Sequence, residues 1–165
     1  MTQIAAFQKE LEREAVNTRK MLSVIPTDKF GWKPHEKSMT IKALATHIAD
    51  IFSWFGMVIN SSELDFAKNP YQADDVNSTP ELVSLFEKNL VQARTTLANA
   101  KEEQLEDNWT MRNGDEIWVN DVKHDVLRMC FGQVIHHRAQ MGVFLRLLNV
   151  PIPGSYGPSA DEMGL

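Results

Sequence analysis

The chain has 165 residues and a hydrophobic content of 43%, and its 17 basic and 22 acidic residues give a formal net charge of −5. This length and composition are typical of one ordinary globular domain, which we expect to span residues 1–165. The acidic balance, without any clustered basic stripe, argues against a nucleic-acid-binding surface. Cys130 is the only cysteine and no apolar run approaches the roughly 18 residues of a membrane span, so we expect a cytoplasmic protein without disulfides or membrane partners.

The first half of the chain shows two helical patterns. Apolar residues at three- and four-residue spacing predict a first helix over about 2–24. Its predicted buried face consists of Ile4, Phe7, Leu11, Ala15, Thr18 and Leu22. After a loop with two prolines and a glycine, a second helix is predicted from Ser38 or Thr40, either of which can cap it, to about Asn60. Its predicted buried face consists of Ile41, Leu44, Ile48, Ile51, Phe55 and Val58.

A long connection separates the second helix from the third. Residues 61–78 show no clear period and are predicted to be irregular. Thr79 followed by Pro80 is a capping residue with a first-turn proline, so the third helix is predicted to begin there. Its predicted buried face consists of Leu82, Phe86, Leu90, Ala93 and Leu97.

A turn signal precedes the last helix. Asn113-Gly114 lies between two short runs of hydrophobic residues, and both positions accept positive φ, which predicts a two-stranded β-hairpin. The fourth helix is predicted over about Val122–Asn149. Residues 151–165 are rich in proline and glycine and are expected to form an ordered strap anchored by Tyr156. The prediction is an all-α four-helix bundle with a small hairpin before its last helix.

Two helices direct polar side chains toward the predicted core. At 100° per residue, His137 lies about 30° from the centre of the apolar stripe of the last helix, and Gln133 about 70° from it on the same flank. These two residues are four apart and can reach one ion. His47 lies about 70° from the centre of the second helix's stripe. The pattern fits either a bundle metal site or hydrogen-bonded core histidines.

Other polar residues near these positions are assigned simpler roles. Asp50 and His136 lie off the apolar stripes and are expected in solvent or at an interface. Cys130 lies on the stripe and is expected to be a core residue, not a nucleophile. The side chains that could line a cavity near the motifs are Glu36, Arg138, Gln140 and Tyr156.

Two segments resemble the DinB-like (DinB/YfiT) family. They are "WKPHEKSMTIKALATHIAD", residues 32–50, and "QVIHHRAQMGVFLRLLNVPIPGSYGPSADE", residues 133–162. The resemblance implies a four-helix bundle in up-down-down-up order with a divalent metal on three side chains. The connection over 61–78 has the length that such a crossover requires.

The family pattern also implies the metal ligands. By motif they are His47, His137 and, where the family typically has a histidine, Gln133. An amide oxygen is a weaker ligand than imidazole for zinc or nickel, so Gln133 should weaken the site. Nickel or zinc is favoured, and manganese or iron is the alternative.

The resemblance implies a class of activity. Relatives include a mycothiol-dependent maleylpyruvate isomerase and bacillithiol transferases, which suggests a low-molecular-weight-thiol S-transferase or a related hydrolase acting on a small molecule. A homodimer is expected, because relatives pair through bundle helices and because His136 and Phe131 would give the last helix a second, partly apolar face. The alternative, favoured by Gln133, is a metal-poor, non-catalytic binding or stress-associated module.

Overall fold

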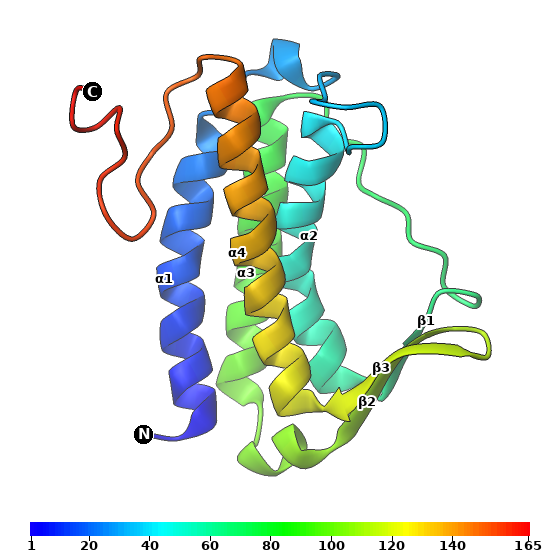
Figure 1. Cartoon of the computed structure of the whole chain (residues 1–165). Helices are drawn as coiled ribbons and strands as arrows, with labels where there is room; N and C mark the ends of the chain where they lie inside the picture. The colour runs from blue at the N-terminus through cyan, green and yellow to red at the C-terminus, as the bar shows by residue number, and fades with distance from the viewer.

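Four long helices form the body of the protein, and the computed structural model describes all residues 1–165 (Figure 1). They are α1 (Gln3–Ser23), α2 (Ile41–Asn60), α3 (Thr79–Asn99) and α4 (Lys123–Leu147), with short 3-10 turns η1 (Thr27–Lys29) and η2 (Glu102–Glu106). Every position predicted for the buried faces of the first three helices is at most 8% exposed, which confirms the periodicity. No helix combines the length and the apolar character that crossing a membrane would need.

Hydroxyl side chains cap the first turns of α1, α2 and α3. Thr40, and not Ser38, caps α2 by accepting a hydrogen bond from the backbone N–H three residues later at 3.1 Å. Ser78 caps α3 in the same way at 3.3 Å, so the predicted cap at Thr79 is wrong by one residue. The Thr79 hydroxyl instead donates to the carbonyl oxygen of Ile25 at 2.6 Å and ties α3 to the end of α1.

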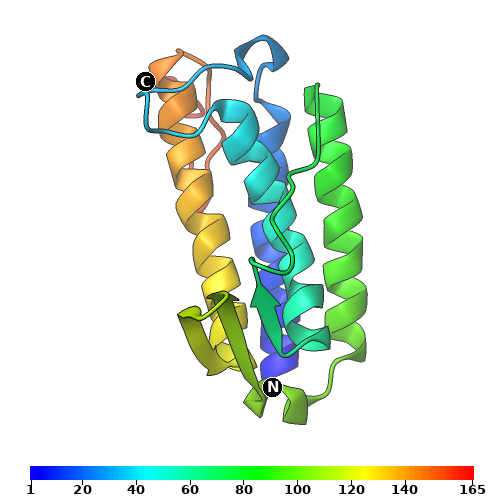
Figure 2. The same cartoon turned by 90° about the vertical axis from the view of Figure 1, so that its right-hand side faces the viewer.

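Contacts at the helix ends define the chain direction. The start of α3 lies beside the end of α1, whereas the Glu102 carboxylate after α3 accepts hydrogen bonds from the backbone N–H groups of Gln3 and Ile4, at 3.2 and 3.0 Å. Lys123 at the start of α4 donates to the carbonyl oxygen of Ile59 near the end of α2 at 3.0 Å. Residues 61–78 therefore run back along the bundle, and α2 and α3 point the same way (Figures 1 and 2).

A three-stranded sheet lies at one end of the bundle. The hairpin predicted from Asn113-Gly114 is present as β2 (Asn108–Asn113) and β3 (Glu116–Val122). The sequence predicted only these two strands. A third strand, β1 (Glu63–Asp65), pairs with β2 in parallel. An isolated hairpin is marginally stable, and a third strand pairs with its open edge. The chain is therefore mostly helical and not purely α.

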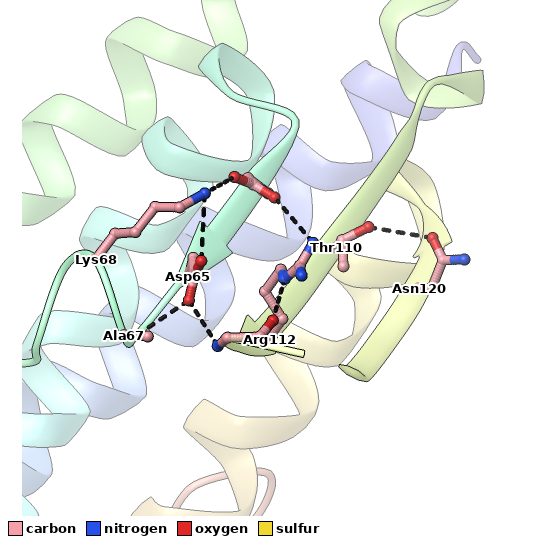
Figure 3. Close-up of polar contacts among 8 residues, drawn as sticks. Asp65, Ala67, Lys68, Thr110, Arg112 and Asn120 are labelled. Carbon is pink, nitrogen blue, oxygen red and sulfur yellow. Dashed lines mark hydrogen bonds and ion pairs between the residues drawn. The ribbon is translucent and has the colours of Figure 1, made fainter. Parts of the chain in front are cut away.

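Asp65 fastens β1 to the hairpin turn (Figure 3). Its carboxylate accepts hydrogen bonds from the backbone N–H groups of Ala67 and Gly114, each at 3.0 Å, and pairs with Lys68 at 3.3 Å. Gly114 has a φ of 61°, in the left-handed region that this turn requires. The side chain of Asp65 is buried, so these donors compensate for its loss of water.

The C-terminal residues fold back along α1 and α4 and are held by two carboxylates. Asp161 pairs with Arg146 at 2.6 Å, and Glu162 accepts a hydrogen bond from the backbone N–H of Gly154 at 3.1 Å. A Cβ atom at Gly154 would lie 2.1 Å from the carbonyl oxygen of Gly157. Glycine is therefore the residue that fits this turn.

Phe131 lies in the core and not on the surface. It is 1% exposed, and its ring packs against Phe7 and Phe55 at centroid distances of 6.0 and 4.8 Å. The position of α4 between α1 and α2 explains why this flank is covered (Figure 1). The expectation that Phe131 contributes to an exposed apolar face of α4 is therefore wrong. The homodimer stays a prediction without the support of this residue.

Candidate functional site

Two imidazole rings meet between α2 and α4. The ring centroids of His47 and His137 are 4.7 Å apart, with an interplanar angle of 75°. His137 is 9% exposed and His47 is half-buried. The two histidines that the helical periodicity directs inward therefore lie side by side.

A hydrogen bond fixes the ring of His137. Its Nδ1 atom lies 2.8 Å from the side-chain carbonyl oxygen of Gln140, one turn further along α4. Because a carbonyl oxygen only accepts, Nδ1 carries the hydrogen in the neutral ring. The lone pair is then on Nε2. From its place in the sequence, Gln140 is a residue that could line a cavity near the site, but the sequence does not predict this hydrogen bond.

Burial keeps both imidazoles neutral. It lowers the pKa of His47 to about 4, and a proton on the neighbouring His137 would lower it further. Burial also lowers the pKa of His137, although the hydrogen bond to Gln140 opposes this. Protonation of either ring is therefore disfavoured at neutral pH, and neutral imidazole is the form that binds metals.

The lowered pKa of His47 predicts a loss of stability in acid. As the pH falls from about 6.5 toward 4, the unfolded chain binds a proton at His47 but the folded protein does not, so the free energy of unfolding should decrease across this range. Denaturant titrations in EDTA at several pH values measure this dependence. His47→Asn should flatten it, and the same substitution at His35, exposed in a loop, should not. Equal slopes in all three proteins would contradict the assignment.

Gln133 is the third of the predicted metal ligands. It is half-buried, one turn before His137, and no hydrogen bond joins it to His47 or His137. His136 is exposed, although its ring centroid is 4.8 Å from that of His137. No group of three His, Cys, Asp or Glu side chains is placed to hold a metal ion. A metal on the two histidines would therefore take any third protein ligand from an amide such as Gln133.

Arg138 and Tyr156 do not line a cavity beside the histidines. Arg138 is buried and pairs with Glu14 of α1 at 2.7 Å, with side-chain exposures of 2% and 4%. The Tyr156 hydroxyl accepts a hydrogen bond from Arg138 at 2.8 Å and donates to Glu14 at 2.9 Å. This cluster joins α1, α4 and the C-terminal residues. Glu36 is exposed in its loop and forms no hydrogen bond with either histidine.

Cys130 is a core residue, as the periodicity predicts. It is fully buried, and burial raises the pKa of its thiol to about 12. The thiolate, which is the nucleophilic form of cysteine, is therefore absent near neutral pH.

Asp50 is buried, contrary to the expectation that it faces solvent or an interface. It is 7% exposed, and the Tyr71 hydroxyl donates to its Oδ2 atom at 2.5 Å. Tyr71 belongs to the 61–78 connection, which covers this face of α2. On the same face, Trp54 contacts His47 edge-on at a centroid distance of 5.7 Å.

Comparisons with known proteins agree with this architecture. Residues 1–164 match the sequence model of the DinB family. The protein YrdA of Bacillus subtilis is 24% identical over 156 residues, which are 94% of this chain and 89% of YrdA. The crystal structure of the DinB-like protein YjoA of Bacillus subtilis is similar with a TM-score of 0.71 and 20% identity, over 91% of this chain and 97% of that one. A mycothiol-dependent maleylpyruvate isomerase is similar with a TM-score of 0.59 and 12% identity, over 86% of this chain and 63% of that one. The chain belongs to the DinB family.

Proposed function

We propose that the protein is a divalent-metal-dependent enzyme whose metal is held by His47 and His137, with Gln133 as a third, weaker ligand. The observation that carries the proposal is the pair of adjacent neutral imidazoles from facing helices. The hydrogen bond from His137 to Gln140 supports it, because metal-ligating histidines commonly donate their other ring N–H to an oxygen atom.

The donor set suits a reactive metal better than a structural one. Three neutral ligands leave at least one coordination position open. A divalent ion bound by these residues would act as a Lewis acid and would lower the pKa of a coordinated thiol or water molecule. Nickel and zinc suit imidazole, and manganese or iron are weaker candidates with this set.

The proposed reaction is the transfer of a low-molecular-weight thiol to a small electrophile. Membership of the DinB family and the similarity of fold to a mycothiol-dependent isomerase support this class. Cys130 is buried with a raised pKa, so the nucleophilic sulfur would come from the substrate and not from the protein.

A second candidate is a metal-poor binding module without catalysis. Gln133 in the middle ligand position favours it, since the chain then lacks a set of three strong donors. The two candidates differ in metal content, which elemental analysis of protein purified without a metal-affinity tag measures directly.

Gln133→His should tighten zinc and nickel binding by about tenfold or more, equivalent to roughly 1.4 kcal/mol, because imidazole donates more strongly than an amide oxygen. Competition titrations with a chromophoric chelator measure the affinity. Gln92→His, on the exposed surface of α3, is the matched control and should change nothing. Negligible affinity in the native protein and in Gln133→His would rule out the metal centre and leave the binding module.

A further inference from the structure

A cavity of about 320 Å³ lies between α2 and the 61–78 connection. Its volume is within the range of pockets that bind small molecules, which is roughly 300–1,000 Å³. Trp54 lines it and also contacts His47, so this one side chain links the wall of the cavity to the histidine pair, although neither histidine lines the cavity. The residues of α2 that line it continue along the helix face that carries His47.

The lining of this cavity is acidic and aromatic. Two carboxylates, Asp50 and Asp74, belong to it, and none of its 11 residues is basic. Three aromatic side chains, Trp54, Phe66 and Tyr71, also line it. Carboxylates with aromatic rings are the groups that bind organic cations in proteins, through ion pairing and cation–π attraction.

One oxygen atom of Asp50 lacks a donor. Oδ2 accepts the hydrogen bond from Tyr71, whereas Oδ1 accepts none from the protein. The one buried side-chain polar atom without a partner is the Thr46 hydroxyl oxygen, so Oδ1 of Asp50 is accessible and can accept a hydrogen bond from a ligand. Burial raises the pKa of Asp50, and the hydrogen bond from Tyr71 lowers it. Lys88 is the only basic residue that affects this pKa, and its effect is smaller than those of burial, Tyr71 and Asp74.

We propose that the cavity binds a primary ammonium group attached to an apolar moiety. The ammonium donates to Oδ1 of Asp50 and lies against the aromatic side chains, and the apolar moiety packs on Met57 and Leu64. Binding needs no metal. That the ligand is an amine-bearing substrate presented to the histidine pair rests on the proposed function.

Three probes of similar shape test the charge preference on EDTA-treated protein at pH 7. They are 2-phenylethylammonium, the neutral 2-phenylethanol and the anionic phenylacetate, each titrated by calorimetry. The ammonium should bind at least tenfold more tightly than the alcohol, and phenylacetate more weakly still. Equal affinity for the three probes would overturn the proposal.

Substitutions then locate the site. Asp50→Asn keeps the shape of the side chain and should weaken binding of 2-phenylethylammonium at least tenfold, and Trp54→Leu should weaken it several-fold. Asp28→Asn removes the same charge from an exposed position in η1 and should leave affinity unchanged. Unchanged affinity in Asp50→Asn would overturn the assignment. If that variant does not fold, Trp54→Leu and the probe series still decide.

His137→Ala separates this proposal from the metal centre. It should lose metal binding and keep the affinity for 2-phenylethylammonium. Metal binding without preference for the ammonium probe would reject the cation pocket alone. Preference for the ammonium probe without metal binding would reject the metal centre alone.

Discussion

Replacing Arg138 with alanine should lower the free energy of unfolding by about 3–5 kcal/mol. The substitution leaves the carboxylate of Glu14, 4% exposed, in the interior without its ion pair. Thr18 also loses a hydrogen bond from the guanidinium, at 3.1 Å, and Tyr156 loses one at 2.8 Å. An uncompensated buried charge is among the most destabilising changes that one substitution can make.

Denaturant titration measures this loss, and a surface pair provides the matched control. Arg128 of α4 pairs with Glu10 of α1 where the arginine side chain is 47% exposed, so Arg128→Ala should cost only about 0–1 kcal/mol. Replacing Glu14 and Arg138 together by leucine and methionine should recover most of the stability, because no charge is then left unpaired. A cost for Arg138→Ala no larger than that for Arg128→Ala would contradict the assignment.

His137→Ala should weaken zinc binding on the order of 100-fold or more. Loss of a residue that only orients a ligand typically costs 10–100-fold in metal affinity, and loss of the ligand itself should cost more. His47 and one amide oxygen would be left to hold the ion. Gln140→Ala should give an intermediate effect of about tenfold, because it frees the ring of His137 without removing it.

His136→Ala is the matched control for this series. It removes an imidazole from the neighbouring position of α4, where the side chain is exposed. Its zinc affinity should equal that of the native protein in the same chelator competition. Equal losses in His136→Ala and His137→Ala would indicate non-specific binding to surface imidazoles and contradict the site.

The first three helices were predictable from sequence because each has a continuous apolar stripe that is buried. Leu82 and Leu97 illustrate this, since both are 0% exposed at opposite ends of α3. β1 was not predictable, because three residues carry no period and its partner is a strand more than forty positions later. Phe131 was misplaced for a related reason: a helical wheel shows one stripe, but α4 has neighbours on two sides.

The candidate site likewise contains some residues whose positions the sequence predicts and others whose positions it does not. His47 and His137 lie on flanks of their stripes, so the wheel alone directs both inward. Asp50 lies off its stripe, and the 61–78 connection folds over it, which no local pattern reveals. Glu14 is charged and for that reason looks like a solvent-facing residue. Its burial depends on Arg138, 124 positions away in the chain.

The cluster of Glu14, Arg138 and Tyr156 has a consequence for how the protein matures on the ribosome. Glu14 is synthesised early, but its two polar partners follow 124 and 142 residues later. Until they emerge, burial of α1 would leave the Glu14 carboxylate without a donor, so we expect that helix to stay hydrated in the growing chain. We therefore expect α1 to dock late, and chains interrupted before residue 138 should stay open and accessible to proteases.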